Sequence, residues 1–182
     1  MKLYILMIIL VFIAGCSQAP ESETITKTQG IKELVLSEQE IQQLGLVSTD
    51  DCNIEEYQTS ESSPLGQYAI CFYTITKDDT ELVIEFKKFS NLKDLNGAYQ
   101  YESSHLRSSE GILEENTYGD QSKLYVNNEN DYEAEFNPPG VYFYTLYFTK
   151  DEYLVHITTK GTNEETRDDI ENIGRVILAK FV

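Results

Sequence analysis

The stretch YAICFYTITKDDTELVIEFKKF, residues 68–89, decides the fold class of this chain. Both of its arms are rich in aromatic and β-branched residues, and residues 77–80 between them are typical of a turn. In the second arm Leu82, Ile84 and Phe86 alternate with mainly charged residues, which is the period of a strand with one buried face. The stretch therefore predicts an antiparallel β-hairpin that is buried on one face and largely solvent-exposed on the other.

The segments after the hairpin predict two helices and further strands. Ser90 can cap a helix over about 91–107. A capping box of Thr162 and Glu165 begins a C-terminal helix that runs to about Lys180. Its apolar stripe consists of Ile170, Ile173, Ile177 and Phe181. Between the two helices, turn residues separate strand candidates at about 112–118, 122–127, 132–136, 141–149 and 153–159, which are spaced like an antiparallel meander. The candidate at 141–149 is apolar on both faces, so we expect it to lie inside the sheet and to be covered on both sides.

On the N-terminal side, the chain predicts one short helix and a long loop. Ser37 and Glu40 form a capping box, and Gly45 supplies a left-handed stop after about two turns. Residues 46–66 are acidic, rich in Ser and without a clear pattern, so they predict a long loop. Together the segments predict one α+β domain over residues 31–182. It would be a single twisted antiparallel sheet of about six to seven strands, packed against a short N-terminal helix, a middle helix and a C-terminal helix.

A family resemblance lies in the closing segment, residues 147–181, YFTKDEYLVHITTKGTNEETRDDIENIGRVILAKF. It resembles the closing β-hairpin and helix of PsbP-like domains, which are shared by thylakoid photosystem subunits and many small exported lipoproteins. The run FKKFS at 86–90, followed by a helix with Ala98 and Tyr99, fits the same layout. The resemblance implies an α-β-α sandwich over roughly residues 34–181 and a role as an accessory or binding protein. Because the family has no common catalytic set, it assigns no residue a role.

Residues 1–16 have the pattern of an export leader. Lys2 precedes an apolar run that is too short for a membrane-spanning helix, because such a helix needs roughly 20 apolar residues. The residues IAGC at 13–16 resemble the lipobox of bacterial-type and archaeal lipoproteins, which implies that Cys16 carries a thioether-linked lipid and becomes the mature N-terminus. Residues 17–30 are polar and predict a flexible linker. We therefore expect a protein that is anchored to the cell membrane by its lipid and faces outside the cytoplasm.

The charge of the chain restricts its partners. It carries 31 Asp and Glu against 14 Lys and Arg, a formal net charge of −17. Such a surface repels a phosphate backbone, which excludes nucleic acid. It also repels an anionic membrane, so the lipid on Cys16 would be needed to hold the protein there. The acidic surface favours a cationic or neutral partner, such as an envelope protein, a peptide or a divalent cation.

Two further cysteines, Cys52 and Cys71, could form a disulfide in an exported protein. The bond would close a loop of roughly 20 residues, stabilise the fold by about 3 kcal/mol and pin the acidic loop to the first strand of the hairpin. Alternatively, Cys71 is a small buried side chain and both thiols are free. Neither His105 nor His156 has a partner at a metal-ligand spacing, and so we expect both to be structural or surface groups.

Two weaker candidates for ligand binding remain. In and just before the strand candidate at 132–136, every second residue is a carboxylate, so the three carboxylates would lie on one face of the strand. They could hold Ca²⁺ or simply form a solvated acidic face. They are Asp131, Glu133 and Glu135. Three aromatic residues of the candidate at 141–149 could line a concave site for a sugar or a peptide, or could fill the seam between sheet and helix. They are Tyr142, Tyr144 and Tyr147.

The sequence contains none of the patterns GxSxG, GxGxxG or GxxxxGK[ST]. We therefore expect a binding or accessory role rather than an enzyme, and no cofactor. Two alternatives stay open. One is a lipid-anchored hydrolase of envelope or extracellular polymers, which requires a cleft with convergent titratable groups. The other is a structural envelope component, which requires a large exposed apolar patch or self-association.

Overall fold

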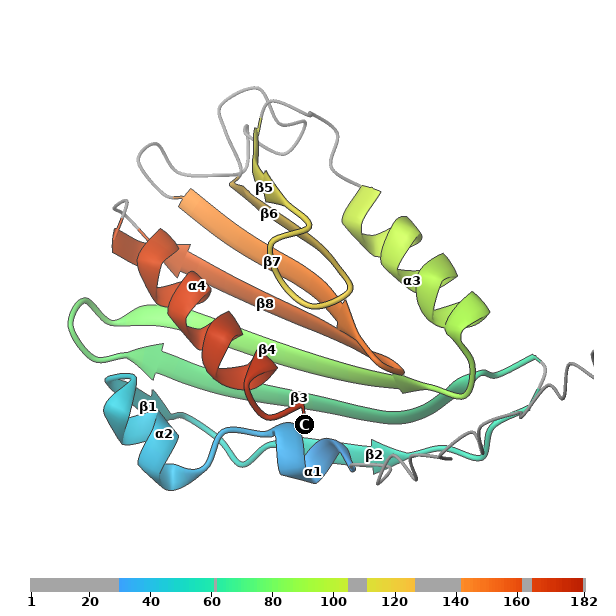
Figure 1. The fold of residues 1–182 in the computed structure, drawn as a ribbon. Coiled ribbons are helices and arrows are strands. Elements are labelled where there is room, and N and C mark those ends of the chain that lie inside the picture. The colour runs from blue at the N-terminus through green and yellow to red at the C-terminus, as the bar shows by residue number, and fades with distance from the viewer. Residues whose placement is uncertain (1–29, 61, 105–110, 127–141, 162–164, 182) are drawn as a thin grey trace, which may run out of the picture.

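The computed structural model describes residues 30–60, 62–104, 111–126, 142–161 and 165–181. In these residues, eight strands form one antiparallel sheet in the order β1-β3-β4-β8-β7-β6-β5, and β2 also pairs with β3 (Figure 1). The strands are β1 (Leu46–Ser48), β2 (Asn53–Glu56), β3 (Leu65–Ile75), β4 (Thr80–Phe89), β5 (Ile112–Glu115), β6 (Gln121–Val126), β7 (Tyr142–Lys150) and β8 (Tyr153–Gly161). The helices are α1 (Ile31–Leu34), α2 (Glu38–Gln43), α3 (Leu92–Ser104) and α4 (Glu165–Leu178). The fold is therefore α+β, with N-terminal, middle and C-terminal helices packed on an open sheet, as predicted.

The predicted hairpin is confirmed as β3 and β4. Their register pairs Cys71 with Ile84 and Phe72 with Val83, and β8 pairs with the other side of β4. Leu82, Ile84 and Phe86 of β4 are buried, whereas the residues between them are half-buried. We call the side of the sheet that buries Leu82 the α4 face, because α4 packs on it, and the opposite side the α3 face.

The later strands form the predicted meander. β5 and β6 match the candidates at 112–118 and 122–127, and β7 and β8 match those at 141–149 and 153–159. Each of these strands pairs with the next along the chain. The candidate at 132–136 lies outside the described residues.

Helix α4 packs across β7 and β8 and covers the main core. Three isoleucines of its predicted stripe are buried, namely Ile170, Ile173 and Ile177. The helix approaches the sheet closely at Gly174, where an added Cβ would lie 2.6 Å from Leu146 Cδ2. Because protein cores are close-packed, a larger residue there would displace its neighbours. The end of the chain is tied to the N-terminal helices, since Lys180 Nζ donates to the Val35 carbonyl at 2.8 Å.

Helix α3 covers part of the opposite face. It contributes to a second, smaller core whose buried members are Phe89, Leu95, Tyr99, Tyr147 and Leu154. β7 therefore lies inside the sheet with a helix on each side, which confirms the prediction for the strand candidate at 141–149. The three residues 105–107 at the end of the predicted middle helix lie outside the described residues.

The N-terminal capping box is confirmed. The Ser37 N–H donates to Glu40 Oε2 at 2.7 Å, the Glu40 N–H donates to Ser37 Oγ at 3.4 Å, and Gly45 adopts a φ of +67°. The loop predicted for 46–66 is wrong in part, because β1 and β2 lie within it and pair with β3. All residues of β2 are exposed, so this edge strand has no buried face that would give an alternating apolar pattern.

Candidate functional site

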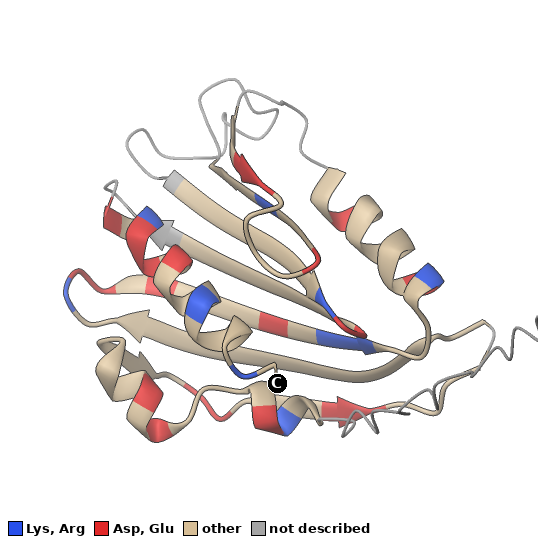
Figure 2. Cartoon of the chain, viewed as in Figure 1, with Lys and Arg blue, Asp and Glu red and all other residues tan. Residues whose placement is uncertain are grey.

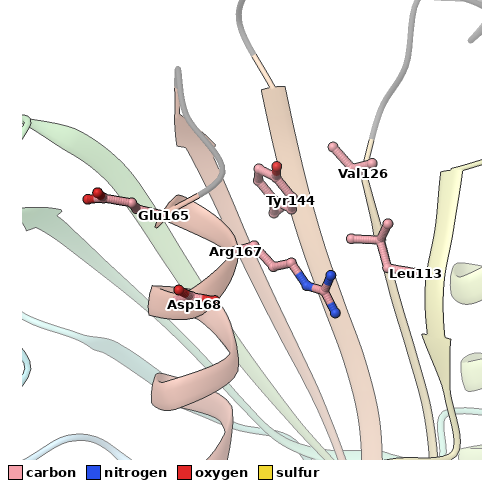
Figure 3. Close-up of a pocket in the computed structure, with 6 residues that line it drawn as sticks. All are labelled: Leu113, Val126, Tyr144, Glu165, Arg167 and Asp168. Carbon is pink, nitrogen blue, oxygen red and sulfur yellow. The ribbon is translucent and has the colours of Figure 1, made fainter.

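A cavity of about 560 Å³ lies on the α4 face, beside the first turn of α4 (Figure 3). Its walls come from three neighbouring strands and from the helix. The lining residues are Leu113 of β5, Val126 of β6, Tyr144 of β7, and Glu165, Arg167 and Asp168 of α4. A cavity of this volume can take a small molecule or side chains of a peptide.

The strand side of the cavity is apolar. Val126 and Tyr144 are directly opposite each other on β6 and β7, so their side chains project to the same side of the sheet. Leu113 lies where the register between β5 and β6 shifts, and it is 37% exposed. One aromatic ring and two aliphatic side chains thus form a wall on which an apolar part of a ligand can pack.

Arg167 lies on the helix side of the cavity and is held by two carboxylates. Its Nη2 donates to Glu114 Oε1 at 2.7 Å, and its Nε donates to Glu171 Oε1 at 2.8 Å. The hydrogen bond to Glu171 is the largest cause that raises the pKa of Arg167 above its ordinary value. The guanidinium therefore bridges α4 and β5, with a carboxylate on each of two of its nitrogen atoms.

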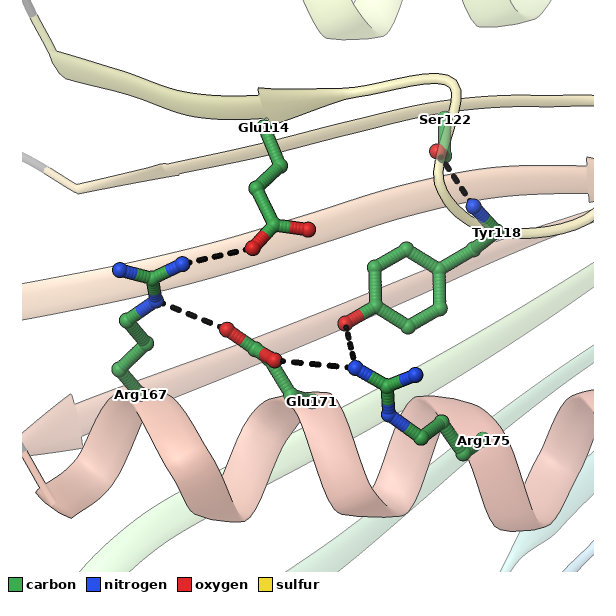
Figure 4. Close-up of polar contacts among 6 residues, drawn as sticks. All are labelled: Glu114, Tyr118, Ser122, Arg167, Glu171 and Arg175. Carbon is green, nitrogen blue, oxygen red and sulfur yellow. Dashed lines mark hydrogen bonds and ion pairs between the residues drawn. The ribbon is translucent and has the colours of Figure 1, made fainter.

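The polar contacts continue along α4 to a buried tyrosine (Figure 4). Glu171 Oε2 accepts from Arg175 Nη2 at 3.2 Å, and the same nitrogen donates to the Tyr118 hydroxyl at 3.4 Å. The Tyr118 N–H donates to Ser122 Oγ at 2.9 Å. Burial, with a further contribution from the negative charge of Glu171, raises the pKa of Tyr118 to about 12. These contacts fix α4 to the β5–β6 hairpin and so hold the walls of the cavity in place.

The surroundings of the cavity favour neutral or cationic ligands. Glu165 and Asp168 are exposed at its edge, and they add to the two carboxylates that already balance Arg167. Lys77 lies 3.5 Å from Glu165, but it also binds Asp169 at 2.8 Å. An anion entering the cavity would therefore meet more negative than positive charge.

A second group of polar side chains lies on the α3 face, and we call Glu85, Tyr147, His156 and Thr158 the His156 cluster. His156 Nε2 and Thr158 Oγ1 are 2.7 Å apart, and His156 Nδ1 lies 3.6 Å from Glu85 Oε2. The Tyr147 ring stacks on the imidazole with 4.2 Å between the ring centroids. Hydrogen bonding to His156 is the chief cause of the lowered pKa of Glu85, whereas burial raises the pKa of Tyr147.

The structure separates the tyrosines that the sequence singled out. Tyr144 lines the cavity, whereas Tyr147 belongs to the His156 cluster on the opposite face. Their spacing of three residues puts them on opposite sides of a strand. The side chain of Tyr142 lies outside the described part of the structure. Tyr144 and Tyr147 therefore do not share a site, and only Tyr144 stays a candidate for the cavity.

A disulfide joins Cys52 and Cys71, with the two Cα atoms 4.3 Å apart. Cys71 is buried in β3, and Cys52 directly precedes β2. The bond therefore fixes the start of an exposed edge strand to the hairpin.

Several predicted positions lie outside the described residues. They are Cys16, His105, Asp131, Glu133 and Glu135. Lipidation and Ca²⁺ binding at these positions therefore stay predictions. Among the residues that the structure does describe, no three His, Cys, Asp or Glu side chains are grouped so that they could hold a metal ion.

Sequence reasoning did not find Arg167 or Glu114. The spacing of four residues between Arg167 and Glu171 is typical of a helical ion pair and could have drawn attention to the helix side. Glu114 is 53 residues away from Arg167, and nothing local marks it as a partner. This long-range contact joins α4 to β5 beside the cavity, and only the folded chain brings its two residues together.

No protein-family model matches this chain, and no curated protein matches it. Within the described ranges, no helix has the length and apolar character needed to cross a membrane. A function for this chain therefore rests on the contacts and charges of its own residues.

Proposed function

We propose that this protein is a lipid-anchored, extracytoplasmic binding protein whose cavity beside α4 takes a neutral or cationic ligand. The observation that carries the proposal is the cavity itself, in which an apolar strand wall faces a charge-balanced Arg167 and two exposed carboxylates. A ligand that combines an apolar part with hydroxyl or cationic groups can use both sides. Oligosaccharides, organic amines and basic peptides belong to this class.

Three features support a lipid-anchored binding protein outside the cytoplasm. The lipobox-like residues at 13–16 would place a lipid on Cys16. The disulfide between Cys52 and Cys71 fits a compartment outside the cytosol, where such bonds persist. The resemblance to PsbP-like domains, many of which occur in small exported lipoproteins, agrees with an accessory or binding role. Because the net charge of −17 repels an anionic membrane, the lipid would supply the attachment.

Thermal unfolding of the full-length protein in non-ionic detergent tests the ligand class. Spermidine, a neutral oligosaccharide, a cationic peptide, Ca²⁺ and inorganic phosphate would each be added in excess. A ligand that binds only the native state adds about 2.7 kcal/mol of stability at 100 times its dissociation constant. We expect an amine, a sugar or a cationic peptide to raise the midpoint, and phosphate to leave it unchanged.

Two charge-reversed variants locate the binding. Asp168→Lys places a positive charge at the cavity and should abolish the shift caused by a cationic ligand. Glu38→Lys is the matched control, because Glu38 is also exposed in the first turn of a helix, in α2 away from the cavity. A spermidine shift that survives Asp168→Lys, or a shift that phosphate alone produces, would contradict the proposal.

The anchor is tested separately by Cys16→Ala. We expect the wild-type protein to partition into the detergent phase of a Triton X-114 extract, and the variant to move to the aqueous phase. Equal partitioning of the two proteins would exclude the lipid on Cys16.

One observation favours the hydrolase as a second candidate. His156 lies between Glu85 and Thr158 in the order of a carboxylate, a base and a hydroxyl nucleophile. Against it, β4 and β8 pair as antiparallel strands at this point, so their N–H groups lie in the sheet and do not converge on a developing oxyanion. Hydrolysis of p-nitrophenyl esters that is lost in Thr158→Val and kept in Thr145→Val would favour the hydrolase over the binding protein.

A further inference from the structure

Part of the α3 face carries apolar side chains that none of the described helices covers. Along β3, Tyr68, Ile70 and Phe72 alternate with buried residues of the opposite face, whereas α3 packs on β4, β7 and β8. Phe72 is 39% exposed, and Val83 is its direct partner on β4. Val47 of β1 is 53% exposed. We call Val47, Tyr68, Ile70, Phe72 and Val83 the β3 strip.

These residues lie on one side of the sheet. Val47 pairs with Thr74, which is two residues from Phe72 on β3 and therefore projects to the same face. The strip thus runs from the edge strand β1 over β3 to β4. Single exposed apolar residues are normal on protein surfaces, but neighbouring ones mark surfaces that bind partners.

The charge around the strip is negative. From residue 33 to residue 76 the sequence contains no Lys, Arg or His, but eight Asp and Glu. Figure 2 shows the acidic residues along β2 at this edge, whereas those of α1 and α2 belong to helices that pack on the α4 face. Asp50, Asp51 and Glu55 are exposed on the edge that β1 and β2 form, and Glu81 is exposed opposite Thr74 on β4.

Lys87 of β4, which pairs with Tyr68 of the strip, does not offset this charge. Lys87 Nζ lies 2.7 Å from Glu102 and 3.4 Å from Glu85, so carboxylates surround it. An anionic membrane or a second copy of this acidic chain would therefore be repelled at the strip.

We infer that the β3 strip binds a basic segment of a partner protein, in which Lys or Arg alternate with apolar residues. The apolar residues of that segment pack on Phe72 and Val47, and its cations meet the acidic edge. This surface lies on the face opposite the cavity, and the inference does not depend on what the cavity binds. The aromatic side chain of Phe72 is the central anchor, because exposed aromatic residues contribute most of the binding energy at such surfaces.

The test measures peptide binding to the full-length Asp168→Lys protein, whose cavity should no longer take a cationic peptide, in non-ionic detergent by fluorescence anisotropy. The probe is a short peptide of alternating Lys and Val, compared with peptides of alternating Lys and Ser and of alternating Glu and Val. We expect saturable binding of the Lys-Val peptide alone, weakened by added salt. Phe72→Ser should weaken it by about tenfold, and Glu81→Lys should weaken it as well.

Leu92→Ser is the matched control, since Leu92 is 61% exposed at the start of α3 and lies outside the strip. It should leave the affinity unchanged. The inference is overturned if the Lys-Val peptide does not bind the Asp168→Lys protein, if the Lys-Ser or Glu-Val peptide binds it equally well, or if adding Phe72→Ser leaves the affinity unchanged. A wild-type dimer in sedimentation that Phe72→Ser dissociates would assign the strip to a second copy instead.

Discussion

Reduction of the disulfide between Cys52 and Cys71 should destabilise the domain by an amount that follows from its position. The bond joins residues 19 apart in sequence. The loop-closure entropy that it removes from the unfolded chain corresponds to about 3 kcal/mol at 25 °C. For a domain of this size each kcal/mol changes the unfolding midpoint by roughly 2–4 °C, so we expect the reduced protein to unfold roughly 6–12 °C below the oxidised one.

The assay is thermal unfolding followed by circular dichroism, with and without reductant. The double variant Cys52→Ser, Cys71→Ala is the control, because it should unfold near the reduced wild type and should not respond to reductant. The reasoning would be refuted if reductant left the wild-type midpoint unchanged, or if it lowered the midpoint of the double variant equally.

Three other perturbations test the packing and electrostatics of the fold. Gly174→Ala should lower the free energy of unfolding, measured by urea denaturation, by about 1 kcal/mol. The new Cβ would lie 2.6 Å from Leu146 Cδ2, and this overpacking outweighs the gain in helix propensity. Burial raises the pKa values of Tyr73 and Tyr118 to about 12, so the folded state keeps phenolic protons that the unfolded state loses near pH 10. The free energy of unfolding should therefore fall as the pH rises from 10 to about 12. In a pH titration, the absorbance of tyrosinate should appear together with unfolding. The pKa of Glu85 in the folded protein is lowered from 4.5, so the carboxylate stabilises the fold above pH 4.5 and this stabilisation is lost as the pH falls through the folded pKa. Glu85→Gln should therefore flatten this part of the acid unfolding curve. An unchanged curve would argue against the contact with His156.

The elements that bury one face in the core were predictable, because their apolar residues recur with the period of a strand or a helix. The alternation from Leu82 to Phe86 predicted the hairpin, and the isoleucine stripe of α4 predicted the helix that covers it, because both elements bury one face in the core. β1 and β2 were missed because they add only a few residues to the edge of β3. Their pairing is specified by the partner strand and by the bond to Cys71, which a local pattern does not contain.

The candidate site was predictable only in its parts. Tyr144 could be recognised as an aromatic residue of an interior strand, but not as a wall of a cavity on one face. Arg167 and Glu171 have helical ion-pair spacing, yet the contact with Glu114 arises only when β5 is folded beside α4. Leu113 lies where the register between β5 and β6 shifts, and no residue in the sequence indicates this shift.

The most direct test of the central claim is a methyl NMR titration of the full-length protein in detergent, observed at Leu113 and Val126. Both side chains line the cavity, and the methyl groups of Leu92 provide an internal reference outside it. With spermidine, a neutral oligosaccharide and inorganic phosphate as probes, the account predicts saturable shifts at Leu113 and Val126 with the amine or the sugar, and none with phosphate. Shifts with phosphate alone, or shifts of equal size at Leu92, would contradict a cavity that selects neutral or cationic ligands.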